Sequence, residues 1–393
     1  MPARSRAFGP IQLEQDLDGV SRLLGWSFGF PPEETREWFE RGGMDNVRVL
    51  RDGRTPVAAL MFIPMGQFFG GRRVPMVGLA GVGVAAERRG TGVGAQLCRA
   101  AVAELHRGGV ALSALYPSTQ KLYRGAGWEV AGGRWEVRIA PGLIRVHESS
   151  GTVRPMEVAD RPAVMELHGK MASGHNGELD RGPYCWSRVF EPRGRSPMGF
   201  LVEHRGKIEG YAVLYQVPLD PPESELVAHD LCAQTPRAAR KLLSLLAQHK
   251  TLSQSVCWRG APAGAMLQLL PERGYQVHLR DPWMLRLCHL QRALEARGYP
   301  PGMRAELHLA VEDDVLARNA GSWIVRVEDG AAAVTRGGSG RVRADIRALA
   351  ALYTGHLPAE TLALTGGISG RPADLAIATA VFAGSAPAMT DMF

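Results

Sequence analysis

The stretch from Val77 to Gly94, VGLAGVGVAAERRGTGVG, constrains this chain more than any other segment. Its apolar start predicts a buried strand, and the residues from Ala95 to His106 have the apolar spacing of a helix. A strand, a glycine-rich loop and a helix start together favour phosphate binding, because first-turn N–H groups lack helical partners and the helix dipole attracts an anion. Glycines let a pyrophosphate approach the backbone without a Cβ in the way.

The spacing of the glycines narrows the kind of phosphate ligand. They fall at 90, 92 and 94, which is not the dinucleotide pattern G-x-G-x-x-G, and no lysine follows as in a Walker loop. The run from Arg89 to Gly94 fits R-x-x-G-x-G and so resembles the loop of GCN5-related N-acetyltransferases. A solvated glycine turn before an ordinary helix is the alternative. The resemblance implies that the pyrophosphate of acetyl-CoA is bound by Arg88, Arg89, Gly90, Thr91, Gly92, Val93 and Gly94.

Three glycines inside the apolar strand, at 78, 81 and 83, are unusual for a central strand. They predict a bulge, or a place where a ligand or another backbone comes close. In the acetyltransferase family the matching strand splays here, and its N–H groups face the thioester. The resemblance therefore adds Val82, Gly83 and Val84 to the cofactor-binding residues.

A second stretch, from Ser118 to Trp128 (STQKLYRGAGW), resembles the family's xLYxxxGF segment. Ser118 is expected to be the N-cap of a helix that runs for about two turns and ends at Gly127, and we include it among the cofactor-binding residues. The resemblance implies that Tyr123 is the general acid, since a phenol with a pKa near ~10 can protonate a leaving thiolate. Packing alone is the alternative role of Tyr123.

The composition excludes several function classes. Apolar residues make up 45% and charged residues 22% of the 393, which is ordinary for a globular protein and suggests two or three domains. The net charge of +7 comes without a dense Lys/Arg cluster, so nucleic-acid binding is not indicated. Five cysteines without a C-x-x-C pair favour reduced thiols in the cytoplasm and no metal site. Neither a signal peptide at the N-terminus nor a membrane span is expected.

The first sixty-odd residues predict helices and a hairpin. We expect a strand at 10–13, a helix at about 16–26, a second helix from Pro31 onwards and a hairpin over 47–64, followed by a polar connection at 67–75. Aromatic residues gather in this part. These aromatic side chains can pack in the core. Alternatively, Trp26, Phe28 and Trp38 line a pocket for the acceptor amine.

From Thr152 the same order of elements begins again. A strand and a helix at 153–168 precede a hairpin over 199–217, a strand at 226–232 and a helix that starts at Thr235-Pro236. The second copy has AQTPRAAR at 233–240, where the first has its glycine loop. Without glycines this helix start is not expected to accept a pyrophosphate closely. The last hundred residues alternate like sheet strands, followed by helices at 345–353 and 372–382, and resemble the sterol-carrier-protein fold.

The whole arrangement is similar to the enhanced-intracellular-survival (Eis) N-acetyltransferases. The expected fold is α/β (α+β): an active GNAT domain at 1–150, a degenerate GNAT-like domain at 151–288 and a sterol-carrier-like domain at 289–393. The resemblance implies acetyl transfer from acetyl-CoA to amines, including aminoglycosides, in a homo-hexamer. It also implies that the C-terminal carboxylate, here that of Phe393, is the general base.

The sequence does not decide which amine accepts the acetyl group. Eis members carry an acidic residue after the first helix, where this chain has Trp26-Ser27-Phe28; Asp391 and the glutamates at 33 and 34 are candidate replacements. A protein lysine or another small amine is an alternative acceptor, and a non-catalytic lipid-binding protein is an alternative class. Cys98 falls on an expected packing face of its helix, so direct transfer is predicted rather than an acetyl-cysteine.

Overall fold

The computed structural model describes residues 6–220 and 222–393; the first five residues of the N-terminal stretch discussed above lie outside this range. The chain divides into two compact units, each described separately below. Unit 1 comprises Met1–Ala131, Trp283–Ser385 and Phe393, and unit 2 comprises Gly132–Pro282 and Ala386–Met392. None of the described helices is long and apolar enough to cross a membrane.

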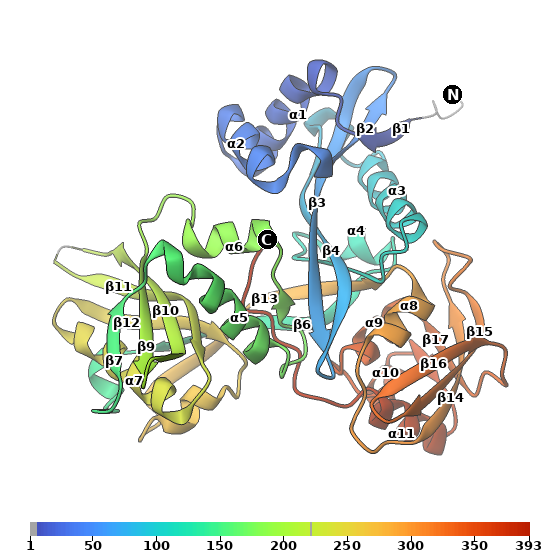
Figure 1. Cartoon of the computed structure of the whole chain (residues 1–393). Coiled ribbons are helices and arrows are strands. Elements are labelled where there is room, and N and C mark those ends of the chain that lie inside the picture. Colours follow the sequence, from blue (N-terminus) through green and yellow to red (C-terminus); the bar gives the residue numbers. More distant parts are fainter. Residues whose placement is uncertain (1–5, 221) are drawn as a thin grey trace. The chain divides into compact units, whose positions relative to one another are not determined.

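The N-terminal part of unit 1 is a sheet covered by helices (Figure 1). Its strands, in spatial order, are β1 (Ala7–Pro10), β2 (Val47–Asp52), β3 (Thr55–Phe69), β4 (Arg72–Val84), β5 (Leu112–Leu115) and the 283–287 part of β13 (Tyr275–Leu287). The strands β4 and β5 pair in parallel, and α3 connects them. The helices are α1 (Leu13–Phe28), α2 (Pro32–Gly42), α3 (Val93–Arg107) and α4 (Gln120–Arg124).

Three predictions for this part are wrong: a connection, the start of a strand and the start of a helix. The expected connection at 67–75 is instead the end of a long hairpin, in which β3 and β4 pair as far as Phe69 and Arg72 around Gly70-Gly71. Both turn glycines have positive φ, which a two-residue hairpin turn favours. The first strand and helix each begin three residues earlier than expected, at Ala7 and Leu13.

The core of this part lies under α3. Apolar residues of α3 such as Leu97 and Val102 are fully buried and pack with Leu60 and Leu79 of the sheet. Tyr123 and Trp128 belong to the same cluster. Burying a Leu or Val side chain contributes about 1.5–3 kcal/mol, so this cluster fixes the start of α3 against the ends of β4 and β5.

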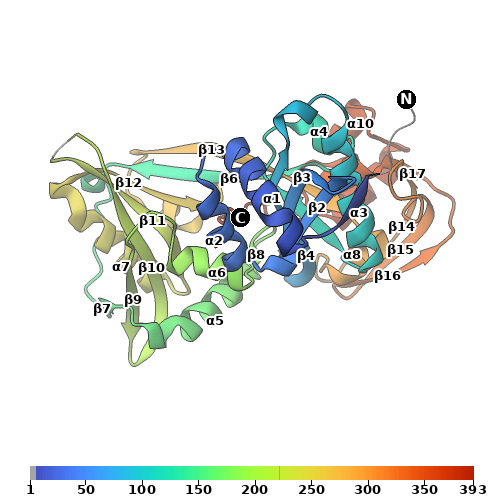
Figure 2. The same ribbon diagram turned by 90° about the horizontal axis from the view of Figure 1, so that it is seen from above.

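The remainder of unit 1 is a second sheet with its own helices (Figure 2). The strand order is β16 (Ala331–Arg336), β15 (Gly321–Glu328), β14 (Ala305–Glu312), β17 (Val342–Asp345) and β18 (Ile368–Ser369). The helices are α8 (Leu290–Ala296), α9 (Ile346–Tyr353), α10 (Ala359–Leu364) and α11 (Pro372–Val381). The predicted strands and the helices predicted at 345–353 and 372–382 are present, the helices as α9 and α11, whereas α8, β17, α10 and β18 were not predicted.

Unit 2 repeats the strand and helix order of the first sheet. Its strands are the 132–139 part of β6 (Glu129–Ile139), β12 (Ser253–Gly260), β11 (Ser224–Ala233), β10 (Lys207–Pro218), β9 (Met198–His204) and β7 (Thr152–Pro155), with β8 (Leu179–Asp180) off this path. Its helices are α5 (Arg161–Ala172), α6 (Pro183–Phe190) and α7 (Pro236–Ala247). As in unit 1, one pair of strands, β11 and β12, is parallel and is joined by a helix, α7. The predicted second copy therefore has the topology of the first.

Candidate active site

The glycine loop of unit 1 leaves the start of α3 open. A short turn at Ala86–Arg88 follows β4, and then Gly90 and Gly92 adopt φ values of 75° and 84°, which disfavour any residue with a Cβ. A Cβ built on either glycine would meet no atom within 4 Å. Gly92 is the N-cap of α3 and supplies no side-chain hydrogen bond. The first turn of α3 therefore has no side-chain cap, and such a helix start favours a phosphate.

The side chains of the loop fix its shape. The Thr91 hydroxyl donates to the carbonyl of Arg88 at 2.7 Å. The guanidinium of Arg88 pairs with Asp52 at 3.4 Å, and that of Arg89 donates to the Ser27 hydroxyl at 3.3 Å. Both arginines carry positive charge at the loop, where it favours an anionic ligand, and both are tied to neighbouring elements.

The strand that leads into the loop has the bulge predicted from its glycines. Gly83 pairs with Ala59 and Ala80 with Met61, so two residues of β4, Gly81 and Val82, stand opposite one of β3. Gly81 has a φ of 58°, and a Cβ there would overlap the ring of Trp38. A bulge interrupts the ladder and leaves backbone groups unpaired. This is the place where the family resemblance puts N–H groups facing the thioester.

Tyr123 lies in the last turn of α4, packs in the core cluster with residues of α3 and is 4% exposed. Its ring stands edge-on to Trp128, with 6.3 Å between centroids. Burial raises the pKa of its phenol well above the ordinary value, the neighbouring Cys98 thiol raises it further, and a hydrogen bond with Ser118 opposes the rise. The phenol is therefore protonated at any working pH, as a general acid must be.

Ser118 does not have the expected capping role. Thr119 is the N-cap of α4 and its side chain makes no capping hydrogen bond, while the Ser118 side chain bonds to Tyr123. The helix also ends earlier than predicted, with its C-cap at Gly125. The prediction of Ser118 as N-cap failed because either residue of the Ser118-Thr119 pair can cap a helix, and the Ser118 hydroxyl instead bonds to Tyr123.

The C-terminal residue belongs to the same unit as Tyr123. The ring of Phe393 lies 5.7 Å from that of Tyr116, which directly follows β5. A Cβ on Gly78 of β4 would overlap both the Phe393 ring and the end of Met65. Gly78 is thus the residue that makes room for Phe393, a contact between residues more than three hundred positions apart. Nothing local in the sequence indicated this pairing or the part of Tyr116 in it.

The aromatic residues near α1 and α2 divide into two groups. Phe39 is fully buried, as the core-packing reading expects. Trp26 and Phe28 are 76% and 48% exposed, so that reading is wrong for them. Phe28 stacks on Phe30 at 6.0 Å, which leaves an exposed aromatic surface at the end of α1. Trp38, through its contact with Gly81, is the predicted acceptor-site residue that touches the strand of the cofactor loop.

Cys98 is unsuited to covalent catalysis. It is fully buried in α3, and burial raises the pKa of its thiol to about 12. All five cysteines are free and buried. Because the thiolate is the nucleophile, a thiol held protonated in an apolar core is inert.

We therefore expect Cys98→Ala to retain activity close to the wild-type level, since the buried thiol is held protonated. Steady-state rates and peptide mass spectrometry after incubation with acetyl-CoA test this. An acetyl group trapped on Cys98, or loss of turnover in a variant that is still folded, would contradict direct transfer.

The segment that precedes Phe393 is held in unit 2 by buried polar groups. Arg181 donates to Asp391 at 2.9 Å and to both oxygens of Asp230, and its side chain is 2% exposed. The Thr390 hydroxyl donates to Glu178 at 2.9 Å. Asp391, predicted to contact the acceptor, is thus engaged with Arg181. These bonds fix the course of the chain up to Met392.

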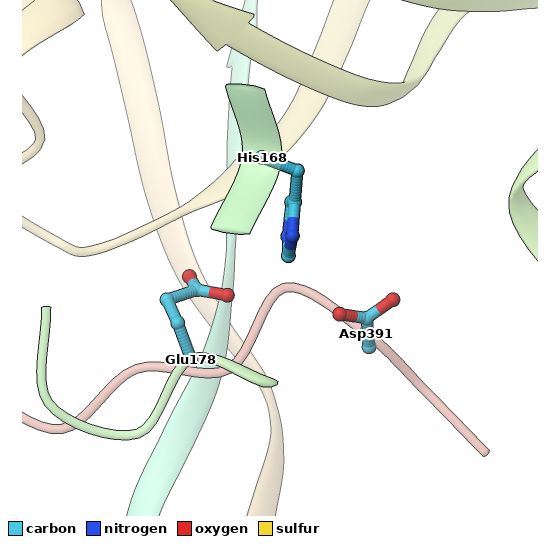
Figure 3. Close-up of side chains that lie close together, drawn as sticks. All are labelled: His168, Glu178 and Asp391. Atoms are coloured by element: carbon cyan, nitrogen blue, oxygen red, sulfur yellow. The ribbon is translucent and has the colours of Figure 1, made fainter. Parts of the chain in front are cut away.

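Three groups of the types that bind metals meet at this segment (Figure 3). The ligand atoms of His168, Glu178 and Asp391 lie within 4.8 Å of one another, and the His168 ring is directed between the two carboxylates. Burial and the Asp391 charge raise the pKa of Glu178 to about 7, and burial and Arg181 lower the pKa of His168 to about 4. The Arg181 cation, already paired with Asp391, competes with a metal for this carboxylate.

The equivalent helix start in unit 2 is closed. The Thr235 side chain caps α7 by accepting from the N–H of Ala238, and Pro236 occupies the first helical position. One first-turn donor is therefore already used by the protein itself, and proline removes another. Of the two corresponding helix starts, only that of α3 combines open glycines with an uncapped first turn.

Comparison with known proteins agrees with this geometry. Models of the acetyltransferase (GNAT) domain match residues 10–131 and 177–287, and a sterol carrier protein domain model matches 290–390. A GCN5-related N-acetyltransferase from Anabaena variabilis is 33% identical, with a TM-score of 0.95 over 99% of this chain and 100% of that one. The chain belongs to the GCN5-related N-acetyltransferases and is an acetyltransferase with tandem GNAT domains and a sterol-carrier-like domain.

Two further proteins are similar to this chain. An uncharacterized N-acetyltransferase from Streptomyces avermitilis is 28% identical over 332 residues, 80% of each chain. Eis1 from Mycobacterium abscessus is 20% identical with a TM-score of 0.80, over 99% of this chain and 100% of that one, which shows a shared fold.

Proposed function

We propose that this protein transfers the acetyl group of acetyl-CoA directly to an amine, with the reaction at the unit 1 site. The observation that carries the proposal is the open, uncapped start of α3 behind Gly90 and Gly92, within the same unit as the buried, protonated Tyr123. The loop would hold the pyrophosphate, and the bulge at Gly81-Val82 would direct the thioester. We further propose that unit 2 binds no acetyl-CoA.

The acceptor step needs a base. An amine of lysine type has a pKa near ~10.4 and must lose a proton before it attacks the thioester carbon. The Phe393 carboxylate is proposed to take that proton, as the Eis resemblance implies. A free α-carboxylate with a pKa of ~3.5 is a weak base, so burial or a water relay must assist it.

The donor step needs an acid. The C–N bond forms as the carbonyl becomes an oxyanion, which the N–H groups of Val82 to Val84 would stabilise by about 3 kcal/mol per donor. The C–S bond then breaks, and the Tyr123 phenol gives its proton to the CoA thiolate. The attacking nitrogen loses its second proton to solvent as the intermediate collapses, the Phe393 carboxyl returns its proton to solvent, and Tyr123 regains one from solvent. The products are the N-acetylated amine, CoA and one released proton.

The cofactor assignment predicts the effect of a single methyl group. Gly92→Ala should raise the KM for acetyl-CoA about tenfold or more, because a left-handed alanine costs ~1–2 kcal/mol and its methyl enters the phosphate space. Gly53→Ala is the matched control: Gly53 has a φ of 62° and equally open surroundings, but lies in the β2–β3 turn. Equal KM values for acetyl-CoA in both variants would refute the proposal that this loop binds the pyrophosphate.

The acceptor class is tested by a screen with a thiol-release assay. The Eis resemblance favours aminoglycoside-type polyamines, and a protein lysine is the alternative. Release of CoA with an aminoglycoside but not with lysine peptides would support the first class, and the opposite pattern the second. Absence of CoA release with every amine would refute the proposed function.

A further inference from the structure

Arg286 of β13 is a fully buried arginine of unit 1, and it lies against the segment that carries Tyr123. A Cβ built on Gly127 would come within 2.7 Å of the guanidinium carbon of Arg286 and within 2.9 Å of its Nε and Nη1 atoms. Gly127 has a φ of 89°, so both its backbone conformation and the guanidinium disfavour any other residue there. The glycine before Trp128 is therefore the point at which Arg286 contacts the turn after α4.

The turn that contacts Arg286 is bonded directly to Tyr123. The Tyr123 carbonyl accepts the N–H of Trp128, the residue after Gly127, at 3.1 Å. The Trp128 ring stands edge-on to the Tyr123 ring, and its Nε1 donates to the carbonyl of Ser113 at 3.1 Å. Ser113 of β5 in turn pairs with Arg286 of β13. A movement of the guanidinium would therefore reach Tyr123 through the turn and through the Trp128 ring.

Asp313, which directly follows β14, anchors the guanidinium. Its two carboxylate oxygens accept from Nη2 of Arg286 at 2.8 and 2.7 Å, and neither side chain has any exposed surface. The same carboxylate accepts the N–H groups of Val315 and Leu316 and the side-chain amide of Asn319. Four bonding groups thus fix the place of Asp313, and Asp313 fixes that of Arg286.

The segment that carries Asp313 comes from the sterol-carrier-like part of the chain. It connects β14 to β15, and its Leu316 side chain packs in the same core cluster as Tyr123 and Trp128. This segment therefore reaches the core of the first acetyltransferase domain in two ways, through an apolar side chain and through the Asp313–Arg286 pair.

Packing alone does not explain an arginine at this position. Removing an ion pair from water is costly, and apolar residues of similar volume often stabilise a core as well or better. Two donors of the Arg286 guanidinium, Nε and Nη1, have no hydrogen-bond partner within the described residues. An arginine does provide a rigid planar group that a carboxylate can orient. Such a group suits the support of a backbone turn.

We propose that Arg286 is a positioning residue for Tyr123. Asp313 orients its guanidinium, and the guanidinium holds the Gly127 turn so that the phenol is placed to protonate the CoA thiolate. The inference rests on the proposed function and adds a residue to its donor step. It also gives the β14–β15 segment a part in acetyl transfer. A misplacement of about 1 Å can cost about a hundredfold in rate, so small movements of this support matter.

The test is a double-mutant cycle between Arg286 and Tyr123. Arg286→Lys keeps a positive charge beside Asp313 but removes the planar group that lies against Gly127. We expect it to lower kcat about tenfold in the wild-type background and less than about twofold in the Tyr123→Phe background. The KM for acetyl-CoA should change less than about twofold in both. A general loss of packing would instead lower kcat by the same factor in both backgrounds.

Arg51→Lys is the matched control. Arg51 is also a buried arginine of unit 1 and pairs with a buried carboxylate, that of Asp16. Its other bonds go to the carbonyls of Val49 and Pro10, in strands β2 and β1. Any change in kcat that Arg51→Lys causes should therefore be the same in the two backgrounds. Thermal unfolding of every variant reports the stability that each substitution costs.

Gly127→Ala tests the same contact without altering the ion pair, and it replaces Arg286→Lys where that variant does not fold. The added methyl must displace the guanidinium or the turn, so we expect the same loss of kcat and the same dependence on Tyr123. An equal loss in both backgrounds would overturn the inference. A wild-type kcat in either folded variant would overturn it as well.

Crystal structures of the wild type and of Arg286→Lys separate this inference from the function on which it rests. A displaced Gly127 turn and Tyr123 ring, in a protein whose wild type forms no N-acetyl amine, would support the positioning and refute the acetyl transfer. An unmoved Tyr123 ring with a wild-type rate of amide formation would overturn the positioning and leave the proposed function standing. An unmoved ring in a protein without acetyl transfer would refute both.

Discussion

Tyr123→Phe is expected to lower kcat by about a hundredfold or more, the usual contribution of a positioned general acid. The substitution removes one hydroxyl from a ring that is 4% exposed and packs edge-on against Trp128, so the apolar packing of the ring is retained. The KM for acetyl-CoA should change little, because the proposed pyrophosphate contacts come from the loop before α3.

The pH dependence gives a second readout for Tyr123. Burial raises the pKa of the phenol, so its proton is retained as the pH rises through the range in which an ordinary tyrosine, with a pKa near ~10, would ionise. The wild-type rate should therefore show no loss due to Tyr123 below about pH 10.

Two further variants complete this test. Tyr275→Phe, a matched change in unit 2, should leave kcat unchanged. Ser118→Ala removes the hydrogen bond to Tyr123 and should have a smaller effect than Tyr123→Phe. A Tyr123→Phe enzyme with a wild-type kcat would remove the phenol from the mechanism.

Extension of the chain beyond Phe393 is expected to lower kcat by about ten- to a hundredfold, the lower part of the range for a lost general base. A Gly-Ser tail converts the terminal carboxylate into an amide, while the ring can keep its place over Gly78. The same tail at the N-terminus is the control.

Phe393→Ala distinguishes the contribution of the ring from that of the terminal carboxylate. It keeps a terminal carboxylate but loses the contacts with Tyr116 and Gly78 that position it. We expect a reduced kcat here too, because the base is no longer held in place. Full activity of the C-terminally extended enzyme would refute the carboxylate as base, whatever the alanine variant does.

The local part of the site could be predicted from the sequence. The loop, the bulge and Tyr123 each depend on residues within a short window, where glycine spacing and apolar periodicity carry the information. The same holds for the second GNAT-like copy, whose strand at 226–232 and helix start at Thr235-Pro236 were predicted from the local pattern and are present as β11 and α7.

The rest depends on contacts between distant parts of the chain. Gly78 could be interpreted only as a bulge or a close approach, and the partner, Phe393, lies at the other end of the sequence. The Arg181–Asp391 pair of unit 2 and the Arg286–Asp313 pair of unit 1 likewise join separate segments. The Gly70-Gly71 turn is different, because two glycines in sequence do indicate a hairpin. The arginines that follow them led to the interpretation of this stretch as a polar connection.

The most direct test of the central claim is the identity of the product. Wild-type protein and Tyr123→Phe are incubated with isotopically labelled acetyl-CoA and the amine panel, and products are analysed by mass spectrometry. The account predicts a labelled N-acetyl amine with the wild type, formed in step with CoA release and strongly reduced in the variant. Acetyl-CoA that binds but yields no labelled amide with any amine would contradict it.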